Sequence, residues 1–154
     1  MKATQFNNLW IPGQVLTATK TLVQGDAGKT IFLNLVGAFE VVLPIPKIGM
    51  SFQFVVKTAP SGGSYVISSN SDANIIKGQV YTTDVNSGTD PDFEISGADN
   101  INFADGVAVE GDRIYVISDG TSWFAYGFCS VYNAITFTNH SSTSASISPS
   151  ISPS

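Results

Sequence analysis

About ten short segments in which apolar and polar residues alternate make up most of the chain, and this alternation constrains the fold more than any other feature. Alternation with a period of two is the pattern of a half-buried β-strand, whereas a surface helix buries residues at i, i+3, i+4 and i+7. The segments are rich in Val, Ile, Phe, Tyr and Thr, which suit pleated surfaces. They cover residues 15–22, 30–35, 38–44, 51–58, 64–69, 74–83, 93–97, 101–104, 112–118 and 122–132.

Clusters of Gly, Pro, Asn, Asp and Ser separate these segments, as in APSGGS (residues 59–64) and NSGTDPD (residues 86–92). Such residues favour tight turns. No window of a dozen residues shows convincing helical spacing. The pattern therefore predicts an all-β fold, an antiparallel β-sandwich of jelly-roll type or a barrel.

The stretch GDAGKT at residues 25–30 ends like a phosphate-binding loop, G-x-x-x-x-G-K-[ST]. The first glycine of that motif is missing, because position 23 is Val23. The residues after Thr30 read as a strand, whereas a phosphate loop needs a helix there to aim its N–H groups. We therefore expect a hairpin turn with Lys29 pointing to solvent, and no bound nucleotide.

Two terminal segments do not resemble domain interior, which suggests an arm at 1–13, a sandwich domain at 14–138 and a tail at 139–154. The first segment carries large apolar residues without a strand pattern and is interpreted as an extended arm, or alternatively as a strand that caps its own domain. Its apolar residues are Phe6, Leu9, Trp10 and Ile11. The Ser/Pro-rich tail has the composition of a disordered or polyproline-like segment.

Charged residues make up only 12% of the chain, against roughly 25% in an average protein. A surface built from Ser, Thr, Asn and Gly is common where neighbouring subunits cover it. The net charge of −5 and the scattered lysines argue against nucleic-acid binding, which needs clustered cations. No apolar stretch has the length of a signal peptide core or a membrane span, so we expect synthesis in a cytoplasm and no membrane partner.

The residues that most catalytic and metal sites need are scarce. The single histidine, His140, has no evident triad or ligand companion, and the single cysteine, Cys129, lies in an apolar run typical of a buried thiol. We therefore expect no enzyme activity, no cofactor and no metal. One alternative stays open: Asp84, Asp90 and Asp92 lie in an acid-rich loop whose oxygens suit calcium.

The segment at 122–132 is aromatic at both odd and even positions, so both of its faces are apolar. One face is expected in the core. The other either packs against another copy of the protein, which we favour, or stacks on sugars through Trp123 and Tyr126.

Five elements follow one another in the first half of the chain: LTATKTL at 16–22, DAGKT at 26–30, VLP at 42–44, GMSFQF at 49–54, and a segment from YVI to NIIKG at 65–78. This succession resembles a pattern common in structural proteins of tailed bacteriophages. The pattern occurs in head decoration (cement) proteins and in domains of tail or fibre proteins, which are usually trimeric β-sandwiches.

The resemblance implies a non-enzymatic virion protein that binds the outer head surface as a homotrimer and bridges subunits of the major capsid protein. On this hypothesis the arm residues Phe6, Leu9, Trp10 and Ile11 contact the capsid. The alternative implied by the same resemblance is a host-recognition module of a tail or fibre, which would bind surface glycans through Trp123 and Tyr126.

Overall fold

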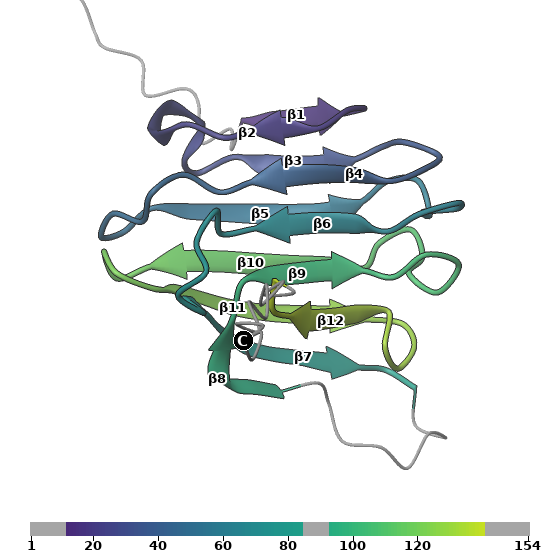
Figure 1. The fold of residues 1–154 in the computed structure, drawn as a ribbon. Helices are drawn as coiled ribbons and strands as arrows, with labels where there is room; N and C mark the ends of the chain where they lie inside the picture. The colour runs from purple at the N-terminus through teal and green to yellow at the C-terminus, as the bar shows by residue number, and fades with distance from the viewer. Residues whose placement is uncertain (1–11, 85–92, 141–154) are drawn as a thin grey trace, which may run out of the picture.

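The computed structural model describes residues 12–84 and 93–140, without the side chains of residues 93–96. Two β-sheets pack face to face (Figure 1). In chain order the elements are β1 (Gly13–Leu16), β2 (Lys20–Thr21), the 3-10 helix η1 (Gln24–Asp26), β3 (Thr30–Leu33), β4 (Phe39–Val42), β5 (Ser51–Val56), β6 (Tyr65–Ser68), β7 (Ile76–Thr82), β8 (Phe93–Ala98), β9 (Asn100–Phe103), β10 (Arg113–Ser118), β11 (Trp123–Cys129) and β12 (Ile135–Thr138). Within the described residues no helix is long and apolar enough to cross a membrane.

The predicted all-β sandwich is confirmed, but its sheets are mixed. The strand order is β1-β3-β5-β10-β11-β7-β8 in the seven-stranded sheet and β12-β9-β6-β4-β2 in the five-stranded sheet. The pairs β1–β3, β3–β5, β7–β11, β2–β4 and β4–β6 are parallel. The antiparallel, jelly-roll-like pairing expected from the sequence is therefore corrected to a mixed one.

The path of the first six strands explains the parallel pairs. Each strand from β1 to β6 lies in the sheet opposite to its predecessor, so the chain crosses the sandwich at every turn (Figure 1). Neighbours within a sheet are then two strands apart in sequence and run in the same direction. Short turns alone do not reveal this, because the same turn residues serve a hairpin and a crossing between sheets.

The core lies between the two sheets and is formed by alternate residues of nearly every strand. Trp123 and Phe52 meet there with ring centroids 5.9 Å apart, and Phe39 and Tyr65 meet at 4.6 Å. The largest fully buried side chains are Trp123, Tyr65, Phe52, Phe54, Phe103, Leu22, Ile31, Leu33, Leu43, Ile67, Ile76 and Ile101. Their burial supplies the main driving force for folding.

A glycine allows β7 and β11 to lie side by side. A Cβ atom added to Gly78 would lie 1.8 Å from the main-chain oxygen of Ala125, well inside contact distance. A larger residue at this position would push the two strands apart, so this parallel pair depends on the absence of a side chain.

The GDAGKT stretch lies in the crossing between β2 and β3, which belong to different sheets. It is therefore a crossover containing η1 and not the predicted hairpin turn. Lys29 also differs from expectation: its Nζ donates to Asp26 Oδ1 at 2.5 Å, and Lys20 Nζ lies 3.4 Å from Asp26 Oδ2. Gly28 has φ +84° and donates its N–H to the Ser51 carbonyl at 2.8 Å.

The positive φ of Gly28 gives a first prediction. Gly28→Ala should lower the free energy of unfolding by about 1–2 kcal/mol, because L-residues avoid this conformation. The matched control is Gly25→Ala, where an added Cβ also meets no atom within 4 Å and φ is not positive. We expect the control to change stability by less than about 0.5 kcal/mol. Equal losses for both variants in urea unfolding would contradict this reading.

The buried Asp26 carboxylate gives a second prediction. The hydrogen bond from Lys29 is the largest reason that the pKa of Asp26 lies below its usual value, and burial opposes it. A lowered folded-state pKa means that this stability is present above the pKa of the unfolded chain, near 4, and is lost as pH falls below it. Asp26→Asn should therefore reduce the loss of stability measured by urea unfolding between about pH 5 and pH 2. An unchanged pH profile would contradict this assignment.

Candidate functional site

The outward side of the seven-stranded sheet carries an unusual number of aromatic side chains. Strand β11 shows why, because it alternates between buried and exposed residues along its whole length. Phe124, Tyr126 and Phe128 point outward with exposed fractions of 44%, 49% and 45%, whereas Trp123 on the inward side is fully buried. The two apolar faces predicted for this segment are thus one core face and one exposed face.

The pairing register extends this exposed surface across six strands. We call it the aromatic face. Its outward residues are Val15, Thr30, Phe32, Ser51, Gln53, Val55, Lys77, Gln79, Tyr81, Arg113, Tyr115, Ile117, Phe124, Tyr126 and Phe128.

Aromatic contacts hold neighbouring side chains of the aromatic face in place. Phe128 stacks against Tyr81 with ring centroids 5.8 Å apart, and the guanidinium carbon of Arg113 lies 5.5 Å from the Phe128 ring centroid. Tyr126 lies directly opposite Tyr115 with ring centroids 5.1 Å apart. These cross-strand pairs form a broad platform with an arginine held over one ring.

Two shallow hollows interrupt the platform. One, of about 180 Å³, is lined by Gln53, Arg113, Tyr115, Tyr126 and Phe128. The other, of about 190 Å³, is lined by Gly28, Lys29, Thr30, Ser51, Phe52, Gln53 and Tyr115. Because Gln53 and Tyr115 line both, the hollows lie next to each other and can each receive a side chain of a bound partner.

The charged residues of the aromatic face are all cations. Arg113 and Lys77 are its charged members, and no member is Asp or Glu, although the whole chain has a net charge of −5. Neither cation forms an ion pair with another described residue. The face therefore combines aromatic rings with positive charges that have no ion-pair partner in the described part of the chain.

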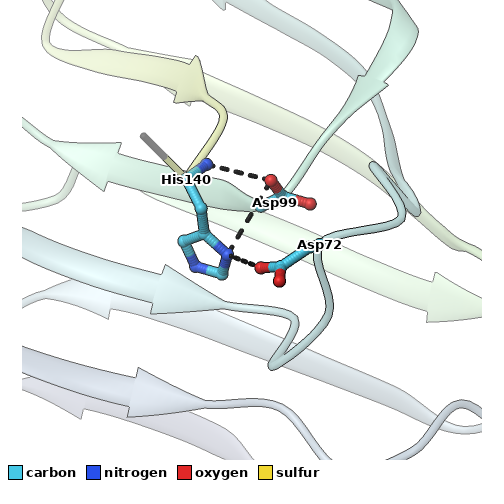
Figure 2. A group of neighbouring side chains, drawn as sticks. All are labelled: Asp72, Asp99 and His140. Atoms are coloured by element: carbon cyan, nitrogen blue, oxygen red, sulfur yellow. Dashed lines mark hydrogen bonds and ion pairs between the residues drawn. The ribbon is translucent and has the colours of Figure 1, made fainter. Parts of the chain in front are cut away.

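A second group of polar side chains lies where β12 ends. Figure 2 shows His140 next to Asp72 and Asp99, which come from two other segments of the chain. His140 Nδ1 lies 2.7 Å from Asp72 Oδ1 and 3.8 Å from Asp99 Oδ2. No companion for His140 was evident from its neighbours in the sequence, and this expectation is wrong because the fold joins residues far apart in the chain.

Asp99 acts as a structural clamp in this group. Its side chain is only 3% exposed and accepts the main-chain N–H groups of Asn74 and His140, each at 2.9 Å. The three ligand-type atoms lie within 4.8 Å of one another, so the group has the donor set of a cation site. The hydrogen bonds already account for the orientation of Asp99 and His140, and we assign the group the role of tying the start of β7 to the end of β12.

The predicted site residues fall in different places. Phe6, Leu9, Trp10 and Ile11 lie outside the described residues, as do Asp90 and Asp92 of the proposed calcium loop. Tyr126 lies on the aromatic face. Trp123 is fully buried, which corrects its assignment as a glycan contact, since a ring with no exposed surface cannot stack on a sugar.

Sequence reasoning missed Tyr115 as the partner of Tyr126, and it missed Tyr81 and Arg113 as the partners of Phe128. The signal was present: Arg113 and Tyr115 alternate with inward residues in the segment at 112–118, just as Tyr126 does in its own segment. Comparison of the chain with protein-family models, curated proteins and solved structures gives no match.

Adjacent residues of β11 give a third prediction. Trp123→Ala should lower the free energy of unfolding by about 3–5 kcal/mol, because it empties the centre of the core. Phe124→Ala, one residue along and on the aromatic face, should cost about 1 kcal/mol or less. Urea unfolding of both variants measures the difference. Similar losses would show that Phe124 is also buried within its own chain.

Proposed function

We propose that the protein is a non-enzymatic virion protein that decorates the outside of a phage head as a homotrimer and stabilises the shell by bridging capsid subunits. The observation that carries the proposal is the aromatic face. The phage resemblance of residues 16–78 supplies the biological setting.

The aromatic face supports association with another protein chain. Large contiguous apolar patches on a soluble protein mark binding surfaces, and Tyr and Arg are enriched among the residues that dominate binding energy. Phe124, Tyr126 and Phe128 are about half exposed, and covering them would remove apolar surface from water. In the proposal this surface joins copies of the protein to one another.

Attachment to the head is assigned to the N-terminal arm, with Phe6, Leu9, Trp10 and Ile11 as apolar anchors. Three arms in one trimer act together, so each arm can bind weakly while the trimer stays attached. A trimer over a junction between capsid subunits would then resist their separation, because the subunits could part only after the arm contacts break.

The second candidate function is recognition of surface glycans, and the hollow beside Tyr126 is the feature that favours it. Tyr115 and Tyr126 offer ring surfaces there, while Gln53 and Arg113 offer hydrogen-bond donors. Aromatic rings with a few polar groups are a common way to bind small ligands. Glycan-array binding that Tyr126→Ala abolishes would favour this candidate over decoration.

The proposed self-association gives a fourth prediction. The wild-type protein should have the mass of a trimer in light scattering after size-exclusion chromatography, and the double variant Phe124→Ser/Phe128→Ser should have the mass of a monomer. Val109→Ser is the control, since Val109 is 41% exposed but lies outside the aromatic face. A double variant that remains a trimer would assign the subunit contact to another surface.

The arm gives a fifth prediction. Removal of residues 1–11 should leave a folded trimer that no longer attaches to heads, as measured by co-sedimentation with heads that lack the protein. The deletion stops before Pro12, whose carbonyl accepts the Thr30 N–H at 3.2 Å beside β1. Normal attachment of the truncated protein would overturn the role of the arm. Antibody label at the tail tip instead of the head would overturn decoration itself.

A further inference from the structure

We propose that the aromatic face binds an acid-bearing, different surface of a second copy of the chain, with a carboxylate of that copy seated against Arg113. The inference rests on the proposed self-association and specifies its geometry: the contact is head-to-tail and not face-to-face.

The charge on the aromatic face favours an acidic partner surface. Arg113 and Lys77 are the charged outward residues of six strands, and neither has an ion-pair partner among the described residues. Two aromatic faces pressed together would bring four positive charges and no described acid into one interface. Like charges brought together in a water-poor contact oppose association, whereas carboxylates from another surface would pair with them.

The surface around Arg113 has a shape that suits a carboxylate. The guanidinium is held over Phe128 at 5.5 Å, and the hollow of about 180 Å³ beside it is also lined by Gln53, Tyr115 and Tyr126. Arginine presents its donors in a fixed fork that matches a carboxylate, and its aromatic neighbour limits its movement. A carboxylate on a short side chain fits this hollow, with tyrosine rings beside it to exclude water.

Exposed acids occur on the rest of the molecule. The exposed acids Asp105, Glu110 and Asp119 lie in segments between strands and are not members of the aromatic face. A second copy therefore offers carboxylates of the required chemistry on surfaces that its own aromatic face does not occupy. This complementarity favours a second copy of this chain as the occupant.

A head-to-tail contact also agrees with the proposed trimer. A two-fold contact uses the same patch on both subunits and closes at two copies, whereas a contact between two different patches generates rings of three or more when the rotation closes. The charge on the aromatic face thus points to the kind of contact that a closed trimer needs.

The test uses full-length protein, sedimentation equilibrium and native mass spectrometry. Arg113→Glu should weaken self-association at least about tenfold, because it places a carboxylate against the incoming one. Arg113→Lys should recover part of the loss, since it restores the charge without the fork. Lys57→Glu is the control, because it makes the same charge change at an exposed lysine outside the aromatic face.

A mixing experiment separates the two geometries. In a head-to-tail ring, mass-tagged Arg113→Glu protein mixed with wild type should yield closed trimers made of wild type alone. In a face-to-face contact, the carboxylate that the variant introduces would meet the unpaired cations of wild type, and mixed pairs would form more tightly than either homogeneous pair. The head-to-tail geometry would be overturned if pairs of wild type with Arg113→Glu formed more tightly than either homogeneous pair. It would also be overturned if Arg113→Glu alone formed a trimer as stable as that of wild type. Neither result would contradict self-association itself.

Failure of the proposed function gives a different result. A wild-type protein that stays monomeric at all concentrations would overturn the proposed self-association and this inference with it. Binding of an acidic glycan by that monomer, lost in Arg113→Glu, would assign the aromatic face to carbohydrate. A wild-type trimer with an affected Arg113→Glu variant and an unaffected Lys57→Glu variant is the outcome that supports the inference.

Discussion

The packing of the two sheets around Trp123 and Phe52 is the interaction on which the rest of the structure depends. Because β11 alternates strictly, placing Trp123 in the core forces Phe124, Tyr126 and Phe128 to the opposite side of the sheet. A shift of one residue in this strand would exchange the two sets. The register of β11 therefore determines both which of its residues enter the core and which form the aromatic face.

The two outer surfaces of the sandwich differ in chemistry, so the two sides of the molecule are not equivalent as binding surfaces. The seven-stranded sheet presents aromatic rings with Arg113 and Lys77. On the other sheet, a hollow of about 420 Å³ has a mixed lining, in which Glu40, Asn100 and His140 lie beside Ala38, Phe39 and Val66. A subunit with unlike surfaces can add to a neighbour in a fixed orientation, which suits an assembly of defined size.

The sequence was sufficient to predict most of the strands, the sandwich and the absence of a helix after Thr30, because each depends on local alternation and turn residues. It missed β12, and the single segment predicted at 15–22 is divided between β1 and β2, which belong to different sheets. Strand directions were not predictable in this way, since the turn near Gly28 joins two sheets and not two neighbours in one sheet. The clamp of Asp72, Asp99 and His140 was also beyond local reasoning, because its members are brought together only by the complete fold. The exposure of Tyr126 and the burial of Trp123 required knowledge of which side of β11 faces the core.

The crossing path of the chain has a consequence for its synthesis. In the seven-stranded sheet β10 lies between β5 and β11, yet β6, β7, β8 and β9 separate it from β5 along the chain. While a ribosome is still translating residues 57–112, β1, β3 and β5 can already pair, but the outer edge of β5 has no neighbour. An open strand edge of this kind is a template for unwanted pairing with other nascent chains. Pairing of β10 with β5 is thus the step that covers this open edge.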